Sequence, residues 1–409
     1  MLRWRRPVTL VGGRILTDQG LAASLRFGSS VLAVDEPPHR ADQVVDLEGA
    51  VVLPGLINAH DHLELNHYGA LRPRERYTNA ADWIGDLRPL IRSDPRIVRA
   101  SRLPLHARLF IGGLKNLLAG VTTVAHHNPF YRGMRRAVPI RLLQRFGWAH
   151  SLDMQEEPVG ANGEPGGDVR EQYHATPTDA PFLVHLGEGI DARAAGELPR
   201  LQASGCVGAN TVMVHGVAWS QENWQQVMRA GAGLVWCPAS NQFLFGHTAH
   251  VREFLASSPA SANHVCLGSD SRLTGARDLL DELHVAAANR VSADALLRMV
   301  TVAAAGLLRL PEAGRLRVGG PADLIVIPAA GESPAEALLH ASRRDIQLSV
   351  VGGLPMIAAA SLRHVFAARN VAAVPLIIDG EQRLAASSLG RAISRSPIAE
   401  PGVTCQHGA

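Results

Sequence analysis

The sequence predicts an α/β protein whose central part is a (β/α)8 barrel and whose two ends together form a smaller β-rich domain. Three observations lead to this prediction. Apolar strand-like runs alternate with helical segments through the middle of the chain, which is typical of βα units around a parallel sheet. Several of these runs are apolar throughout, as expected of strands buried on both faces. The region 55–310 also has about the 250 residues of a typical barrel of this kind.

Short β-rich runs broken by Gly, Asp and Pro occupy both ends of the chain. The first set of runs lies between Pro7 and Pro54, and the same sequence pattern recurs after Leu310 in ADLIVIPA and IQLSVVGG. Such runs are typical of hairpins in a small sheet. We therefore expect one composite β-domain from residues 1–54 and 311–384, and a flexible tail over residues 385–409, which are rich in Ser, Gly, Pro and Arg.

Within the middle region we expect seven strands and at least two long helices. The strands are LINAH, GVTTVAHH, WAHSLDM, PFLVHLGEG, NTVMVHGVA, GLVWCPAS and HVCLGSDS. One helix covers 103–120 and ends at Gly120, and another covers 292–310 with Ser292 as its N-cap. An open, doubly wound sheet is the structural alternative. No GxGxxG follows an early strand, which disfavours the dinucleotide-binding form of that alternative.

Composition excludes several classes of protein. The 409 residues are 46% hydrophobic and carry a net charge of only +3, so a nucleic-acid partner is not favoured. Four widely spaced cysteines form no CxxC pair, which is typical of reduced thiols. No apolar window reaches the roughly 18 to 20 residues of a membrane span, and the basic N-terminus lacks a cleavage site. We expect a cytoplasmic protein.

The stretch GLINAHDH raises the possibility of a metal site. His60 and His62 stand two apart at the end of an apolar strand, so both imidazoles point to the same side. By itself an HxH pair is weak support, because a polar loop with two histidines is equally compatible with the pattern.

Other strand ends carry residues of the same chemical type. His185 closes FLVH, His215 closes VMVH, and Asp270 follows VCLGS. Because the carboxyl ends of barrel strands meet at one face, these side chains are expected to converge. Imidazoles and one carboxylate around an open position are typical of a catalytic Zn²⁺ or Fe²⁺ site. Glu188, three residues after His185, is placed to carry protons beside such a metal.

Separated motifs in this order carry a resemblance to a known family. GLINAHDH, HLGE, VHG, WCPASN and LGSD, followed by GGPADLIVI, resemble the amidohydrolase superfamily, in particular its cytosine deaminase and chlorohydrolase-like (aminohydrolase) branch. The resemblance extends from about Val8 to Val351. It implies a (β/α)8 TIM barrel with a small β-sandwich made from both chain ends, and one divalent metal. Zinc is expected, with iron and manganese left open.

The resemblance also implies roles for individual residues. His60, His62, His185 and Asp270 match metal ligands. Glu188 matches the general acid/base, and His215 matches the histidine that holds the water or polarises the substrate. Binuclear members use a carbamylated lysine on a barrel strand. The only lysine here, Lys115, lies in a predicted helix, which excludes that arrangement.

These residues predict hydrolytic deamination of an amino-substituted nitrogen heterocycle through metal-bound hydroxide, with Glu188, His215 and Asp270 as catalytic residues. Two alternatives stay open: hydrolysis of a cyclic amide or imide or of another C–N or C–Cl leaving group at the same site, and a non-catalytic binding protein on the same barrel. The partner expected is a small-molecule substrate, with no nucleic acid and no membrane. A homodimer is left open.

Several residues near the strand ends are candidates for substrate contacts, each with a structural alternative. Glu64 follows the HxH pair on the first loop, and His127 ends the second strand run. Trp219 offers a stacking surface, although packing explains it equally well. Asn241 stands in WCPASN. Arg272 could bind a substrate carboxylate or carbonyl, or pair with Asp278, Asp281 or Glu282 nearby in sequence.

Overall fold

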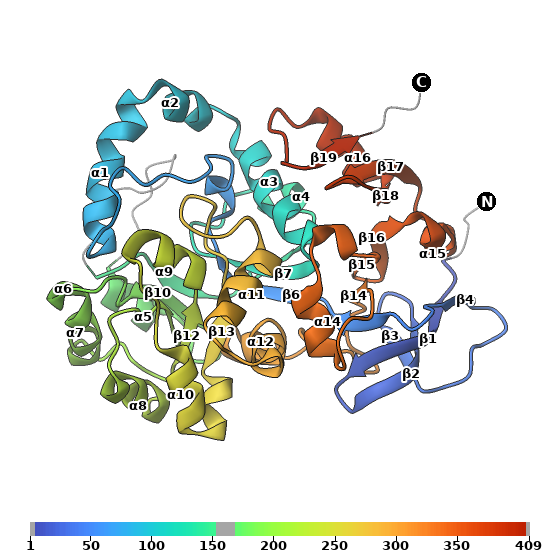
Figure 1. Ribbon diagram of the computed structural model, residues 1–409, viewed down its shortest axis with the longest axis horizontal. Helices are drawn as coiled ribbons and strands as arrows, with labels where there is room; N and C mark the ends of the chain where they lie inside the picture. The colour runs from blue at the N-terminus through green and yellow to red at the C-terminus, as the bar shows by residue number, and fades with distance from the viewer. Residues whose placement is uncertain (1–4, 153–167, 406–409) are drawn as a thin grey trace.

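A large sheet joins the two ends of the chain. The computed structural model describes residues 5–152 and 168–405. An 11-stranded sheet contains strands from both ends, connected where β5 pairs antiparallel with β14. Figure 1 shows the blue N-terminal strands beside the orange and red C-terminal ones. The strands are β1 (Val8–Thr17), β2 (Gly20–Phe27), β3 (Val31–Val34), β4 (Gln43–Asp46), β5 (Val51–Pro54), β14 (Leu324–Ile327), β15 (Leu348–Val351), β16 (Leu354–Ala359), β17 (Ala373–Ile378), β18 (Glu381–Ala386) and β19 (Val403–Cys405).

The middle of the chain forms two parallel sheets. One contains β6 (Leu56–Asp61), β7 (Val121–His126) and β8 (Arg141–Leu142). The other contains β9 (Gly147–Ala149), β10 (Phe182–Leu186), β11 (Thr211–His215), β12 (Gly233–Trp236) and β13 (Val265–Leu267). All residues of β6, β7, β10, β11, β12 and β13 are buried, which explains their apolar runs. The predicted α/β class with parallel strands is confirmed.

Each of the seven expected strands overlaps an observed one. The sequence WAHSLDM forms β9 only at its start, and its last residues, Asp153 and Met154, lie outside the described residues. The strand β8 was not predicted, because two residues carry no readable alternation of apolar and polar side chains.

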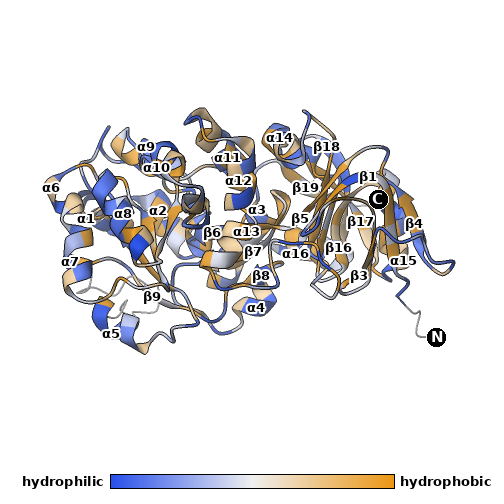
Figure 2. Cartoon of the chain, turned by 90° about the horizontal axis from the view of Figure 1, so that it is seen from below, coloured by the Kyte–Doolittle hydropathy of each residue, from blue (hydrophilic) through white to orange (hydrophobic). Residues whose placement is uncertain are grey.

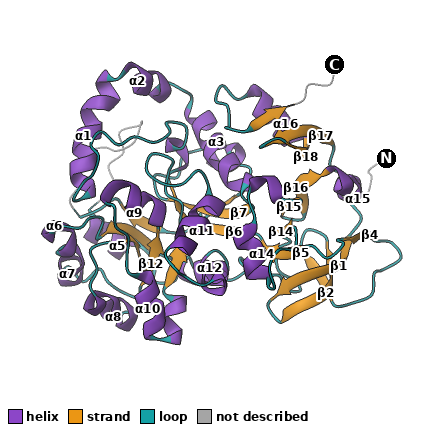
Figure 3. Cartoon of the chain, viewed as in Figure 1, coloured by secondary structure: helices purple, strands orange, loops and turns teal. Residues whose placement is uncertain are grey.

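Helices cover the outside of the parallel strands. Figure 1 shows α7, α8 and α10 around β10 and β12, Figure 3 shows the same helices in purple, and Figure 2 shows both hydrophilic and hydrophobic residues on α7 and α8. The helices are α1 (Ala80–Ser93), α2 (Pro95–Ser101), α3 (Leu105–Leu118), α4 (Met134–Ala137), α5 (Val169–Ala175), α6 (Ala192–Ala195), α7 (Glu197–Ala203), α8 (Gln221–Arg229), α9 (Pro238–Phe245), α10 (Val251–Ser257), α11 (Leu279–Ala288), α12 (Ala293–Met299), α13 (Val302–Leu307), α14 (Pro334–His340), α15 (Arg363–Ala368) and α16 (Ser387–Arg395). Short 3-10 turns are η1 (Leu63–Leu65), η2 (Pro259–Asn263), η3 (Arg343–Asp345) and η4 (Ala360–Leu362). In residues 5–152 and 168–405, no helix combines the length and the apolar character needed to cross a membrane.

The two predicted long helices differ in outcome. The helix expected over 103–120 is α3, and Gly120 follows it with a left-handed φ of +77°. The helix expected over 292–310 begins at its predicted N-cap, Ser292, but is divided into α12 and α13. The carbonyl oxygen of Val300 accepts a hydrogen bond from Ile57 N of β6 (2.8 Å). This tertiary bond lies at the break and takes the carbonyl away from the helical pattern.

The flexible tail expected from Ala385 is wrong for residues 385–405. Ser387–Arg395 form α16, and β19 pairs antiparallel with β17. Between them Glu400 is buried and accepts hydrogen bonds from Arg272 and Arg343. Long-range pairing and a buried ion cluster therefore hold a segment whose composition resembles that of a loop. Residues 406–409 lie outside the described residues.

Candidate functional site

Side chains at the carboxyl ends of four parallel strands meet at one point. The ends of β6, β10 and β11 supply His60, His185 and His215, whose ligand atoms lie within 4.8 Å of one another. A second group that meets the same limit is His60, His62 and Asp270. All five residues are buried. The convergence expected from separate strand ends is therefore present in the fold.

Hydrogen bonds determine which nitrogen of each imidazole faces this point. His127 Nε2 donates to Ala149 O (3.0 Å), so its Nδ1 accepts from His60 Nδ1 (3.3 Å). His185 Nδ1 donates to the carbonyl oxygen of His150 (2.8 Å). His215 Nδ1 donates to Asn241 Oδ1 (2.8 Å). His60, His185 and His215 thus each keep the proton on Nδ1 and present an unprotonated Nε2.

The free nitrogens fit a cation. His60 Nε2 and His215 Nε2 are buried and have no hydrogen-bond partner among the described residues. Asp270 Oδ1 lies 3.9 Å from His60 Nε2 and 3.8 Å from His62 Nε2. Unpartnered buried nitrogens around a carboxylate are the donor set of a catalytic divalent metal site.

Burial keeps the imidazoles neutral. Burial, and then the neighbouring imidazoles, hold the pKa of His60 and that of His185 well below the usual value. Burial also lowers the pKa of His215, although Asp270 and Asn241 oppose this effect. Neutral imidazole is the form that binds a metal, so the site is prepared for ligation at neutral pH.

Asp270 is held in a strained conformation by its neighbours. Its Oδ2 accepts hydrogen bonds from Ser240 (2.9 Å) and Thr274 (3.0 Å), and its Oδ1 accepts one from Ser271 N (2.6 Å). Burial raises its pKa, but nearby His62 and His215 and these hydrogen bonds outweigh burial and lower it. The φ of Asp270 is +51°, a left-handed value that costs on the order of 1–3 kcal/mol in a non-glycine residue. The carboxylate is therefore ionised and fixed in direction.

Glu188 lies beside this group and retains its proton. Its Oε1 is 3.4 Å from His215 Nε2. Burial, followed by the negative charges of Asp270 and Glu197, raises the pKa of Glu188 well above its usual value. Its carbonyl oxygen accepts a hydrogen bond from Ala80 N at the start of α1 (3.0 Å), which fixes the loop that carries it. A protonated carboxyl group at this place can donate a proton.

Lys115 lies beneath the site rather than in it. This fully buried ammonium group in α3 reaches Asn66 Oδ1 (2.8 Å), Asp61 Oδ2 (3.1 Å) and the carbonyl oxygen of Asp270 (3.1 Å). All three of its protons are thus used. The helix can come this close because α3 has Gly112 where a Cβ would lie 2.2 Å from Leu63 O. The lysine links the HxH loop to the strand end that carries Asp270, a role that the sequence did not indicate.

Removing the charge of Lys115 is expected to destabilise the protein. Lys115→Met leaves Asp61 as an unpaired buried carboxylate, which lowers the free energy of unfolding by about 3–5 kcal/mol. The double variant Asp61→Asn/Lys115→Met removes both charges and should recover most of that loss. Urea unfolding followed by tryptophan fluorescence measures both values. Equal stability of the single variant and the wild type would contradict the ion pair.

Glu282 predicts a pH dependence of stability. This buried α11 side chain accepts hydrogen bonds from Ala239 N (2.7 Å) and Ala276 N (3.3 Å), yet burial raises its pKa to about 8. Between the unfolded value of about 4.5 and this folded value, the unfolded chain has released the proton that the folded protein retains. This group therefore makes the protein less stable as the pH rises through that window.

Glu282→Gln is expected to lose that contribution. The variant is somewhat less stable than the wild type at pH values near the unfolded pKa, because its amide accepts only one of the two hydrogen bonds. The difference in the free energy of unfolding between the variant and the wild type should narrow as the pH rises toward 8. Unfolding by urea across this range measures it, with Glu253→Gln, an exposed glutamate of α10, as the matched control. A difference that stays constant with pH would refute the raised pKa.

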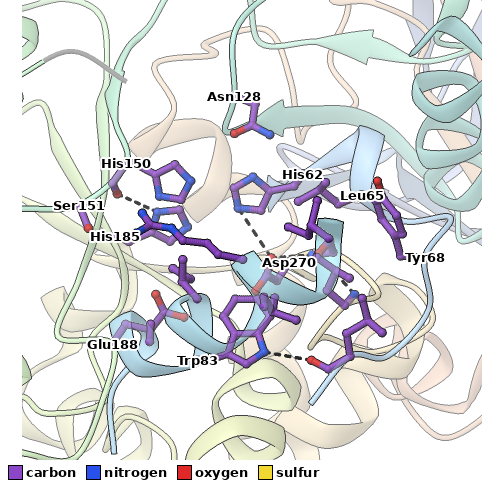
Figure 4. A pocket seen from close by; sticks show the side chains of 18 of the residues that line it. His62, Leu65, Tyr68, Trp83, Asn128, His150, Ser151, His185, Glu188 and Asp270 are labelled. Atoms are coloured by element: carbon purple, nitrogen blue, oxygen red, sulfur yellow. Dashed lines mark hydrogen bonds and ion pairs between the residues drawn. The ribbon is translucent and has the colours of Figure 1, made fainter. Parts of the chain in front are cut away.

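A cavity of about 430 Å³ opens over the site. Figure 4 shows His62, His185, Glu188 and Asp270 around it, with Trp83 of α1 nearby. Trp83 Nε1 donates to Leu71 O (2.9 Å), which fixes the ring. Much of the remaining wall is apolar and comes from the first loop and from α1 and α2, namely Leu65, Leu71, Ile84, Leu87, Ile91 and Ile97. The cavity falls within the size range of small-molecule sites.

The structure brings one of the five substrate-contact candidates to this cavity. Glu64 lines it; its Oε1 accepts hydrogen bonds from Asn128 (2.5 Å) and Tyr131 (3.1 Å), whereas its Oε2 has no hydrogen-bond partner among the described residues. Asn241 lies behind the site, where it orients His215. His127 is fully buried between His60 and Ala149 and does not line the cavity.

Two substrate-contact expectations are wrong. Trp219 is buried and packs edge-on against Trp224, with ring centroids 5.0 Å apart, so it offers no stacking face to the cavity. Arg272 makes two hydrogen bonds to Glu400 (2.6 and 2.9 Å), and its Nε donates to Arg277 O (2.8 Å). Arg272 is an ion-pair residue, but its partner is Glu400 rather than the expected Asp278, Asp281 or Glu282.

Other cavity residues were not selected from the sequence. His150 lines the cavity, and burial, followed by the proximity of His62, lowers its pKa to about 3, so its ring is neutral. Trp83, Tyr131 and Arg108 line it as well. None of these side chains follows a strand in a recognisable motif, apart from His150, which ends the WAH run.

Comparisons with known proteins agree with this geometry. The sequence matches the model of the Amidohydrolase family over residues 173–380. A curated 5-methylthioadenosine/S-adenosylhomocysteine deaminase of Halobacterium salinarum is 26% identical, covering 78% of this chain and 80% of its own. The enzyme of the same name from Syntrophobacter fumaroxidans is 26% identical, covering 85% of this chain and 92% of its own.

Solved structures show the same fold. The zinc complex of atrazine chlorohydrolase from Arthrobacter aurescens superposes with a TM-score of 0.68 at 22% identity, covering 89% of this chain and 99% of its own. An adenosine deaminase from Xanthomonas campestris with bound zinc gives a TM-score of 0.64 at 16% identity, covering 89% and 98%.

Proposed function

This chain belongs to the amidohydrolase family, and from that premise we propose that it is a zinc-dependent aminohydrolase that removes an amino group from a nitrogen heterocycle. The single observation that carries the proposal is the convergence of three imidazole Nε2 atoms beside the buried Glu188, whose pKa is raised by burial. The curated relatives named above are deaminases, which supports the same reaction class.

The proposal includes the architecture that positions the site. The two parallel sheets are two arcs of one (β/α)8 barrel, and the 11-stranded sheet is the β-sandwich. Asp270 N after β13 donates to His60 O of β6 (3.0 Å), which supports closure between the first and last strands. The domains are 1–54 with 311–384, and 55–310; residues 385–405 join the former through β19.

His60, His62, His185 and Asp270 would hold a divalent cation, zinc in this proposal. When bound, such an ion acidifies water enough for attack on carbon at neutral pH. His215 presents its free Nε2 toward the same point and accepts a hydrogen bond that orients the water. Asp270 Oδ1 accepts a proton from the water.

Glu188 supplies the proton that the ring needs. Its carboxyl group protonates the ring nitrogen as water adds to the neighbouring carbon. The proton taken up by Asp270 then passes to the amino group, which leaves as ammonia, and the new hydroxyl group returns a proton to Glu188 as it becomes the carbonyl. The raised pKa of Glu188 favours this role because an ionised carboxylate has no proton to give. Glu64 accepts a hydrogen bond from the substrate through its Oε2, which lies 3.6 Å from His126 Nε2 but has no hydrogen-bond partner within the described part of the chain.

Ammonia release tests the reaction. The zinc-loaded protein is incubated with aminopurines, aminopyrimidines, pterins and aminotriazines, and ammonia is measured. At least one class should turn over, a chelator should abolish the activity, and zinc should restore it. If cyclic amides or imides open instead, or a chlorotriazine releases chloride and no compound releases ammonia, the deaminase assignment is wrong and the corresponding alternative hydrolysis takes its place.

A further inference from the structure

One basic side chain of the cavity has no counter-charge. Arg108 is the fourth residue of α3, is 5% exposed and lines the cavity. In residues 5–152 and 168–405, no acidic side chain lies within ion-pair distance of it, and its Nε has no hydrogen-bond partner. The hydroxyl of Tyr68 is its polar neighbour, and Tyr68 also lines the cavity. Arg108 thus lines the cavity with at least one unused donor, its Nε.

The other buried basic side chains of the described chain are all compensated. Lys115 pairs with Asp61, and Arg343 pairs with Glu400. Arg369 donates to the carbonyl oxygens of Gly353 and Arg6. Burying a cationic side chain without such partners is strongly unfavourable. A buried cation of this kind is therefore expected where a bound ligand supplies the missing acceptors. Among the residues that the structure describes, Arg108 is the exception.

Arg108 lies at the end of the cavity away from the proton donor. Figure 4 shows Tyr68 on the opposite side of the site from Glu188. Side chains of α1 and α2, the two helices that precede α3, line the cavity as well, including the apolar Leu87 and Ile97. The cavity therefore has Glu188 on one side, an apolar wall, and Tyr68 with its neighbours Arg108 and Glu64 on the other side.

We propose that Arg108 forms an anion-binding subsite and that the substrate carries a carboxylate or phosphate group, joined to its ring by a less polar part. A guanidinium group binds either anion through two parallel hydrogen bonds, and here it does so in a water-poor environment. The subsite itself needs no assumption about the reaction; its assignment to the substrate rests on the proposed function. With the ring at the metal end, Arg108 would bind the far end of the molecule.

Anion protection tests the subsite without any substrate. Thermal unfolding of the zinc-loaded protein is measured at constant ionic strength, with sodium chloride replaced by sodium acetate or sodium phosphate. Acetate or phosphate should raise the midpoint temperature of thermal unfolding of the wild type. The control variant Arg102→Met, which changes an exposed residue just before α3, should show the same rise. Arg108→Met should lose this shift, and Arg108→Lys should retain part of it. The anion with the larger shift identifies the group.

Matched substrates test the assignment to the reaction. Adenosine and adenosine monophosphate, and adenosine and its carboxylic acid analogue, are compared by kcat/KM for ammonia release. A charged hydrogen bond to Arg108 should favour the anionic member by about 10- to 100-fold in the wild type, and Arg108→Met should bring the ratio near one.

The outcomes separate the two proposals. Equal anion shifts in the wild type and Arg108→Met, or no shift in the wild type, overturn the subsite whatever the reaction is. An unchanged substrate ratio in Arg108→Met overturns its role in recognition while the deaminase stands. Loss of anion protection in Arg108→Met, with no ammonia from any ring compound, keeps the subsite and overturns the deaminase.

Discussion

Glu188→Gln is expected to lower kcat by about 10²- to 10⁴-fold, the range contributed by a positioned acid or base. Glutamine has the size of glutamate but no acidic proton, so the ring nitrogen cannot be protonated as water adds. The metal content should stay unchanged, because Glu188 is not among the candidate ligand groups. Steady-state ammonia release and elemental analysis of the same preparation measure both quantities.

The matched control for this variant is Glu222→Gln, which changes an exposed glutamate of α8 far along the chain. It should keep wild-type kcat. A Glu188→Gln enzyme with near wild-type kcat and full metal content would remove Glu188 from the mechanism. A variant that loses its metal would instead assign Glu188 to ligation.

Asp270→Ala is expected to abolish turnover together with metal binding. The change removes the only carboxylate in the candidate ligand groups and the acceptor for the proton of water. Metal content after dialysis and ammonia release should fall together. Near-normal rates in this variant would contradict the assigned site.

Ser240→Ala provides a graded comparison for Asp270→Ala. It leaves the carboxylate in place but removes the hydrogen bond that orients Asp270 Oδ2 (2.9 Å). Loss of such a supporting bond typically costs about 10- to 100-fold in metal affinity or activity. We therefore expect the metal content and the turnover of Ser240→Ala to lie between those of the wild type and those of Asp270→Ala. If Ser240→Ala were as damaging as Asp270→Ala, orientation rather than ligation would dominate the effect.

Much of the fold could be predicted from the sequence because buried parallel strands consist of continuous apolar runs. The strand ends that carry His60, His185 and His215 could be located from those runs alone. Two kinds of element were not predicted from the sequence. The strand β8 is too short to show a period, and α16 with β19 lies in a segment with loop-like composition. The strands β8 and β19 are stabilised by pairing with β7 and β17. The local sequence does not indicate such pairing.

Substrate contacts were less predictable than ligands. Arg272 follows the metal-site aspartate directly, but its guanidinium group is bound by Glu400, 128 residues away. Arg108 belongs to no motif, yet it reaches the cavity because α3 packs against the first loop. Sequence position places a residue near a site, whereas competition between partners decides which way its side chain points.

By itself the sequence determined the chemistry available: which residue types follow which strands, and that no second lysine exists to bridge two metals. Only the tertiary structure decided how that chemistry is arranged. The acceptors on His127, His150 and Asn241 determine the imidazole tautomers, and burial keeps the proton on Glu188. The physical reason is that tautomer, ionisation and side-chain direction depend on neighbours brought together by folding, and the identity of those neighbours is not encoded locally.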